Sequence, residues 1–268
     1  MTGAHSMPSL IPVRMTVNQA SPPWFVPLVE NPDRPVRVFG MPQAGAGCST
    51  FGDCAARLSD NAALYGLNLP GRQARFGEPG RTNLAPLVAE LVEELRGFTD
   101  RPYVLVGYCS GAALAYLVAR AMHAAGLPLP RALVAISFPG PQFTEMEQDV
   151  HTLPSAEFWN RITASGGFPP QLAAQPGFRE IFEPALRADY ELFAGFQYTE
   201  LPRMPLDISV VIGRHDPALQ NPIDLVGWSA QTSGTCSVHL VEGDHWLLEG
   251  APDTVARLVE DACRTTAN

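Results

Sequence analysis

The chain has 268 residues, of which 46% are hydrophobic and 17% are charged, as in a folded globular domain rather than a disordered protein. Its formal net charge of −9 argues against a nucleic-acid partner, because such a partner needs a clustered basic surface. The five cysteines form no Cys-x-x-Cys pair, so we expect neither a structural zinc site nor a disulfide framework, and we expect a reducing, cytoplasmic location.

The amino-terminal segment carries prolines that interrupt every apolar run, among them Pro8, Pro12 and Pro22. A signal peptide or a membrane helix needs an unbroken apolar stretch, so we expect neither. We predict a flexible extension over residues 1–23 and one domain over residues 24–268, without membrane association.

Short apolar runs rich in β-branched residues alternate with segments of helical spacing. The predicted strands cover Val36–Gly40, Ala63–Leu69, Tyr103–Gly107, Leu133–Ser137, Ile208–Gly213 and Ser237–Glu242. The predicted helices cover Phe51–Leu58, Leu84–Phe98, Ala112–Ala125, Ile223–Gln231 and Pro252–Cys263. Alternating strands and helices of this kind form right-handed crossovers, so the sequence predicts an α/β fold with a doubly wound, mostly parallel sheet.

The segment from about residue 140 to residue 205 interrupts this alternation and is predicted to form a helical insertion. Helices are expected over Ala156–Ile162 and Gly177–Phe196. The second helix carries more apolar residues than one core-facing stripe requires. Two interpretations stay open: a helix buried on two sides, or a lid whose inner face lines a substrate channel.

The string Gly107-Tyr108-Cys109-Ser110-Gly111 stands between a predicted strand and a predicted helix. This is the setting of the nucleophile elbow in α/β-hydrolases, where the central side chain projects over the sheet from a strained turn. Gly107 and Gly111 leave room for the neighbouring strand and helix. We therefore predict that Cys109 is the nucleophile, at a helix N-terminus that favours its thiolate. The other four cysteines are predicted to be structural.

Two loops further along the chain can supply a base and an acid that orients it. Asp216 follows the strand predicted over residues 208–213, and His245 follows the strand predicted over residues 237–242. The order nucleophile, acid, histidine is that of α/β-hydrolases, and both loops fall at the carboxyl edge of the sheet. We predict a catalytic triad of Cys109, His245 and Asp216.

Two different assignments of these loops stay open. His215 could be the base with Asp244 as its orienting acid, although this reverses the order along the chain. These two residues together with Asp216 and His245 could instead bind a metal. No further histidine or carboxylate stands at ligand spacing, so we expect no metal.

The small residues of Gly40–Gly47 follow the first predicted strand. An oxyanion hole takes one amide from such a loop and one from the residue after the nucleophile. We assign these amides to Ala44 and Ser110. The loop lacks the Lys-Ser/Thr pair of a P-loop, which argues against phosphate binding.

From about Trp24 onward the chain resembles the type II thioesterases of nonribosomal peptide and polyketide assembly lines. Besides the elbow, the resemblance rests on Met41–Gly45, Leu69–Arg75, Gly166–Pro170 and Leu186–Tyr190. It implies an α/β-hydrolase fold with a lid and hydrolysis of acyl groups from the phosphopantetheine thiol of an acyl or peptidyl carrier protein. It implies no cofactor. We expect a monomer.

Two positions depart from this family: Gln43 stands where the family usually has histidine, and Cys109 where it usually has serine. We expect Gln43, Tyr108, Phe182 and Trp246 to contact the substrate.

An acyl-cysteine is itself a thioester, so transfer to an amine or hydroxyl, or cyclisation, competes with hydrolysis as the predicted reaction. The same residues are also compatible with a binding protein without activity, a hydrolase of small free esters, or an engineered cysteine in place of a native serine.

Overall fold

The computed structural model describes residues 22–144, 146–168, 170–175, 177–217 and 221–265. A seven-stranded sheet with the strand order β1-β3-β2-β4-β5-β6-β7 forms its centre. The strands are β1 (Phe25–Pro27), β2 (Val36–Met41), β3 (Ala62–Leu67), β4 (Tyr103–Tyr108), β5 (Ala132–Ile136), β6 (Asp207–Gly213) and β7 (Cys236–Val241). All neighbouring pairs are parallel except β1 with β3, which confirms the predicted α/β-hydrolase class.

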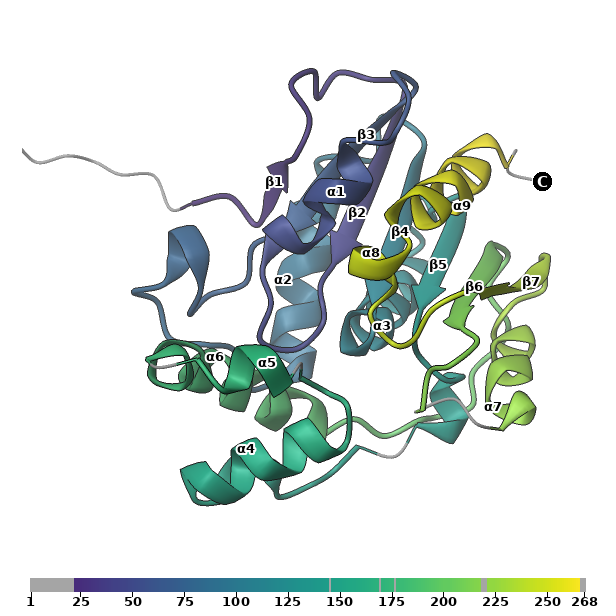
Figure 1. Cartoon of the computed structure of the whole chain (residues 1–268). Coiled ribbons are helices and arrows are strands. Elements are labelled where there is room, and N and C mark those ends of the chain that lie inside the picture. The colour runs from purple at the N-terminus through teal and green to yellow at the C-terminus, as the bar shows by residue number, and fades with distance from the viewer. Residues whose placement is uncertain (1–21, 145, 169, 176, 218–220, 266–268) are drawn as a thin grey trace, which may run out of the picture.

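Helices cover both faces of this sheet and create two separate hydrophobic cores (Figure 1). One face packs against α2 (Leu84–Arg96) and α3 (Ser110–Ala124). The other packs against α1 (Gly52–Ala55), α8 (Leu247–Gly250) and α9 (Pro252–Arg264). The central strands β2 to β5 are buried throughout, which explains why their sequences are apolar runs, interrupted only by Arg37 in β2, rather than alternating patterns.

Between β5 and β6 the chain leaves the sheet and forms the predicted helical lid, drawn at the bottom of Figure 1. Its helices are α4 (Ser155–Ala164), α5 (Pro170–Ala173) and α6 (Phe178–Ala194). They share a third hydrophobic cluster, centred on Phe158, Trp159 and Leu186, which is distinct from the two cores of the sheet. The lid therefore has a hydrophobic cluster of its own, and the end of α6 also packs into a core of the sheet through Leu192 and Phe193.

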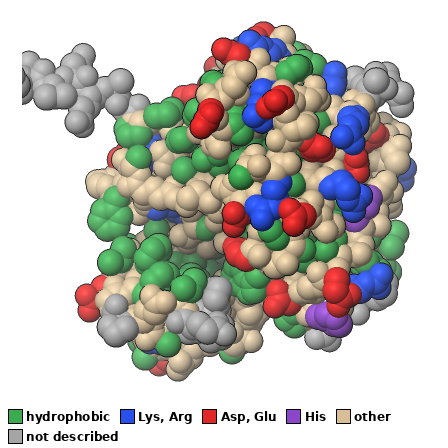
Figure 2. Space-filling model, turned by 45° about the horizontal axis from the view of Figure 1, so that its top comes forward, with side chains coloured by type: hydrophobic (Ala, Val, Ile, Leu, Met, Phe, Trp, Pro, Cys, Tyr) green, Lys and Arg blue, Asp and Glu red, His purple; other side chains and the backbone are tan. Residues whose placement is uncertain are grey.

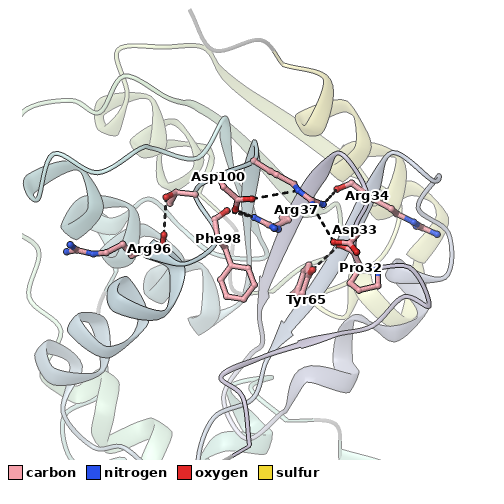
Figure 3. Close-up of polar contacts among 10 residues, drawn as sticks. Pro32, Asp33, Arg34, Arg37, Tyr65, Arg96, Phe98 and Asp100 are labelled. Atoms are coloured by element: carbon pink, nitrogen blue, oxygen red, sulfur yellow. Dashed lines mark hydrogen bonds and ion pairs between the residues drawn. The ribbon is translucent and has the colours of Figure 1, made fainter.

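Polar contacts join loops and strands near the start of β2 and β4, away from the lid (Figure 3). Arg37 donates from Nη1 to the carbonyl oxygen of Phe98 at 2.7 Å and pairs with Asp100. The Tyr65 hydroxyl donates to the carbonyl oxygen of Pro32 at 2.9 Å. The polar side chains at this edge of the sheet stabilise the fold. The residues that are candidates for catalysis lie at the opposite, carboxyl edge.

The remaining elements refine the sequence predictions. The helix predicted over residues 223–231 is divided into α7 (Pro222–Val226) and a 3₁₀ turn over Gly227–Gln231. The helix predicted over residues 51–58 is likewise a 3₁₀ turn, Cys48–Phe51, followed by the short α1. The extension predicted over residues 1–23 lies outside the described residues except for its last two. Among the described residues, no helix is long and apolar enough to cross a membrane.

Candidate active site

The turn between β4 and α3 places Cys109 at the carboxyl edge of the sheet. Its backbone has a φ of 51° and a ψ of −127°, a conformation that residues with a side chain rarely adopt. Its amide donates to the carbonyl oxygen of Ile136 at 2.8 Å, and its own carbonyl oxygen accepts from the amide of Ala112 at 2.8 Å. Hydrogen bonds on both sides thus hold the strained residue in place, as an elbow requires.

The two glycines of the elbow are required by close approach of the backbone. A Cβ atom at Gly107 would lie 2.3 Å from the Cα atom of Ala112, inside the turn itself. A Cβ atom at Gly111 would lie 2.1 Å from the carbonyl oxygen of Met41, at the end of β2. Any side chain at these positions would separate α3 from the sheet and from the loop that follows β2.

His245 and Asp216 lie together on the loops after β7 and β6. The Nδ1 atom of His245 and the Oδ2 atom of Asp216 are 2.9 Å apart, and both side chains are buried. Gly213 allows the loops to meet, because a Cβ atom there would lie 2.1 Å from the carbonyl oxygen of Asp244. The structure therefore brings the predicted base and its predicted orienting acid into hydrogen-bond contact.

The other ring nitrogen of His245, Nε2, is also buried. Burial on its own would lower the pKa of this imidazole, but the negative charge of Cys109 and the hydrogen bond to Asp216 raise the pKa to about 10. A protonated imidazole beside a thiolate is the form of a cysteine–histidine pair in which the sulfur is nucleophilic.

Two hydroxyl groups hold the backbone of His245, and the sequence prediction missed this role. The Tyr108 hydroxyl donates to the carbonyl oxygen of His245 at 3.0 Å, and the Ser137 hydroxyl donates to the same atom at 2.9 Å. Tyr108 is fully buried, so our expectation that it contacts substrate is wrong: it packs beneath the histidine. The only sequence signal for Ser137 was its place at the carboxyl end of a predicted strand.

The two residues predicted to supply the oxyanion amides, Ala44 and Ser110, line the same cavity as Cys109. Within the described part of the chain, neither amide donates to a backbone carbonyl oxygen. Their role as oxyanion donors stays a prediction.

Two adjoining cavities lie under the lid and share the loop residues Gln43 and Ala44. The first, of roughly 170 Å³, contains Cys109 and is lined by Gln43, Ala44, Ser110, Phe138, Met146, Glu147, Gly167, Asp189, Tyr190, Phe193 and Ala194. The second, of roughly 380 Å³, is lined by Gln43, Ala44, Gly45, Ala46, Thr50, Phe168, Leu172, Phe178, Phe182, Trp246 and Glu249. Hydrophobic side chains border a hollow on this side of the molecule (Figure 2).

Three of the four residues that were predicted to contact the substrate line a cavity. Gln43 lies at both cavities, and Phe182 and Trp246 lie at the second. Both open interpretations of α6 hold in part: its residues Leu186 and Leu192 are buried in the protein, whereas Phe182 and Phe193 face the cavities. The lid helix is thus packed on one side and lines the site on another.

The two different assignments of the triad loops do not fit the structure. The side chain of His215 is 69% exposed and lies 3.0 Å from Glu242, not from Asp244. Asp244 is exposed and accepts a hydrogen bond from the amide of Trp246 at 2.9 Å. Within the described ranges, no three histidine, cysteine or acidic side chains are grouped as metal ligands.

The four other cysteines lie in surroundings that disfavour their thiolates. Burial raises the pKa of the Cys54 and Cys263 thiols to about 12. It also raises the pKa of Cys48 and Cys236, which are partly buried. None of the four lines either cavity.

Residues 36–263 match the thioesterase domain family. The chain is 28% identical over 225 residues to the gramicidin S biosynthesis protein GrsT of Aneurinibacillus migulanus, covering 84% of this chain and 88% of that protein. It is 25% identical over 245 residues to the linear gramicidin dehydrogenase LgrE of Brevibacillus parabrevis, covering 90% and 93%. The solved structure of the type II thioesterase BorB from the borrelidin biosynthetic cluster superposes with a TM-score of 0.81 at 25% identity, covering 92% of this chain and 100% of that one.

LgrE is named a dehydrogenase, but the loop after β2 in this chain lacks the glycine pattern of a dinucleotide-binding loop. A dinucleotide-binding loop carries three glycines in the pattern Gly-x-Gly-x-x-Gly. In this chain Gly45 and Gly47 are followed by Thr50 where the third glycine would stand.

We predict that replacing Cys109 by alanine lowers the pKa of His245, because the negative charge that raises it is removed. NMR titration of the imidazole measures this change. Cys236→Ala is the matched control, since Cys236 is a partly buried thiol at the start of β7, outside both cavities. An imidazole that titrates identically with and without the Cys109 sulfur would show that the two groups are not coupled.

Proposed function

The chain belongs to the thioesterase domain family, and from that premise we propose that it removes acyl groups from the phosphopantetheine thiol of a carrier protein through an acyl-enzyme on Cys109. The observation that carries the proposal is the buried 2.9 Å contact between His245 and Asp216, together with a strained elbow whose Cys109 shares a cavity with Ala44 and Ser110. No other cysteine of the chain has this setting. The proposed triad is Cys109, His245 and Asp216.

In the proposed acylation step the Cys109 thiolate attacks the carbonyl carbon of the substrate thioester. The amides of Ala44 and Ser110 donate to the oxyanion of the tetrahedral intermediate. When the intermediate collapses, the bond to the pantetheine sulfur breaks and the His245 imidazolium gives its proton to that sulfur. Asp216 holds the ring in the orientation that directs Nε2 at the reacting atoms.

Deacylation uses the same groups in reverse. Acylation removes the negative charge on Cys109, and with it a main cause of the raised His245 pKa. Neutral His245 then accepts a proton from water as the water oxygen attacks the acyl carbon. The free acid leaves as the Cys109 thiolate and the imidazolium form again.

The two cavities suit an acyl substrate that enters beneath the lid. The second cavity is the larger, and its lid side carries the stacked rings of Phe178 and Phe182, whose centroids are 4.0 Å apart. We assign the apolar part of the substrate to this aromatic surface. Gln43 lines both cavities, and its buried Oε1 atom has no hydrogen-bond partner among the residues that the structure describes, so we assign it to a polar group near the thioester.

The relatives support a place in assembly-line biosynthesis. BorB is described as a type II thioesterase of a biosynthetic cluster, and GrsT as a protein of gramicidin S biosynthesis. We therefore propose an acyl or peptidyl carrier protein as partner, a monomeric cytoplasmic enzyme, and no cofactor. Removal of stalled or mis-primed acyl groups is the role we propose first.

The cysteine also favours a second candidate function, release by acyl transfer or cyclisation. Acylating Cys109 exchanges one thioester for another of similar energy. The resulting acyl-enzyme keeps thioester reactivity toward amines, which an acyl-serine would lose. The choice of acceptor then depends on which nucleophile reaches the cavity.

We expect His245→Ala to lower the turnover of an acylated carrier protein by about 10²- to 10⁴-fold, because the proton is no longer transferred in either step. Chromatographic measurement of the released acid gives the rate. His215→Ala is the matched control, since this exposed imidazole pairs with Glu242 and should leave turnover unchanged. Equal losses in the two variants would contradict the assignment, and comparable turnover of free esters would indicate an ester hydrolase.

We expect the wild-type enzyme to give more amide relative to acid than Cys109→Ser when both are supplied with an acyl carrier and a small primary amine. The physical reason is the greater reactivity of a thioester toward amines compared with an oxygen ester. Mass spectrometry of the products gives the ratio. If both enzymes release acid alone with every amine, the transfer function is wrong and hydrolysis stands.

A further inference from the structure

A buried ion pair joins the lid to the body of the protein next to the active site. Arg72, in the turn after β3, forms two parallel hydrogen bonds to Asp189 of α6, at 2.6 Å from Nη1 to Oδ2 and 2.7 Å from Nη2 to Oδ1. The two residues are 5% and 3% exposed. They belong to two segments that the sequence singled out, Leu69–Arg75 and Leu186–Tyr190, and the proposed chemistry uses neither.

The same ion pair also binds the loop that carries Ala44. The Oδ2 atom of Asp189 accepts a hydrogen bond from the Gly45 amide at 2.7 Å. Nη1 of Arg72 donates to the carbonyl oxygen of Ala46 at 3.0 Å. The loop is therefore held at the two residues that directly follow Ala44, by a donor from the body and an acceptor from the lid.

The close fit of α6 against this loop depends on glycine. Gly45 has a φ of +76°, and a Cβ atom there would lie 2.7 Å from Cδ1 of Leu186, one turn before Asp189 on α6. Only a residue without a side chain can take this conformation so near the helix. The backbone around Ala44 is thus shaped by the docked lid helix.

The charges of the pair are suited to this place. Asp189 lines the cavity that contains Cys109, where a lone carboxylate would oppose the negative charge of an oxyanion. Arg72 neutralises this carboxylate through Nη1 and Nη2, the two terminal nitrogens of its guanidinium group. A buried ion pair is a weak source of stability, because well-packed hydrophobic residues can replace it at little or no cost. Its position suggests a role other than stability.

We propose that Arg72 and Asp189 are positioning residues that hold the Ala44 amide in the oxyanion hole, so that the site is complete only when α6 is docked. The inference rests on the proposed function, because it takes the oxyanion amide from there. It assigns to the lid a direct part in catalysis besides covering the substrate. Neither side chain needs to touch the reacting atoms.

The test compares single variants with the double variant Arg72→Met/Asp189→Leu, which removes both charges and both anchors of the loop. Each single replacement leaves one buried charge without its partner and should lower the melting temperature strongly. The double variant should recover most of that melting temperature. Its rate of acylation by an acyl-pantetheine, followed by intact mass, should stay about 100-fold below wild type at saturating substrate, because the amide is displaced.

Three further measurements keep the outcomes distinct. The KM of the double variant should change little, since the aromatic surface of the second cavity is intact. Arg120→Met is the matched control: Arg120 is a buried guanidinium on α3 that donates to the Tyr116 hydroxyl at 3.0 Å, so this variant should lose stability and keep the acylation rate. Hydrogen exchange over residues 42–48 should accelerate in the double variant and not in Arg120→Met.

A double variant that regains both the melting temperature and the acylation rate of wild type would overturn the positioning role. Unchanged exchange over residues 42–48 would overturn it as well, whatever the chemistry. A wild-type enzyme that forms no acyl adduct would instead overturn the proposed nucleophile. Hydrogen exchange over residues 42–48 would still test whether Arg72 and Asp189 hold the loop in place.

Discussion

The contact of Gly111 with the end of β2 is the constraint on which the site depends. The first turn of α3 lies so near the carbonyl oxygen of Met41 that no side chain fits between them. The same turn holds Cys109 in its strained conformation, and Ala44, in the loop that follows β2, lines the cavity that contains Cys109. The contact therefore joins the elbow to the loop that carries one of the proposed oxyanion amides.

A second glycine contact of the same kind assembles the other half of the site. Gly213 lets the loop after β7 cross the loop after β6, and His245 meets Asp216 at this crossing. The hydroxyls of Tyr108 and Ser137 then hold the histidine backbone from below. Both loops leave parallel strands at the same edge of the sheet, and this brings His245 and Asp216 together.

The sequence predicts those features that repeat along the chain or follow a local motif. The six longer strands were predicted to within two residues at each end. For β2 to β5 the reason is that buried strands of a parallel sheet have nearly continuous apolar runs. The strand β1 was missed, since three residues ending in Pro27 at the sheet edge carry no pattern. The elbow and both triad loops were located because each directly follows a strand.

Contacts between distant segments were beyond the reach of these patterns. Arg72 and Asp189 are separated by 117 positions, and no local spacing indicates that they pair. Tyr108 was misassigned for a similar reason: its neighbours in the elbow face the cavity, whereas its own ring points into the core beneath His245. Which side chains pair with each other depends on the packed tertiary structure. The same is true of which residues of α6 are buried in the core and which line a cavity.

The proposed chemistry requires the acyl group to pass through the sulfur of Cys109. This requirement can be measured by incubating the wild-type enzyme with an acylated carrier protein, quenching with acid and mapping the peptides by mass spectrometry. We expect the acyl mass on the peptide that contains Cys109 and its loss when the sample is treated with hydroxylamine. Turnover without any acyl mass on that peptide, or acyl mass on Cys48 or Cys236 instead, would contradict it.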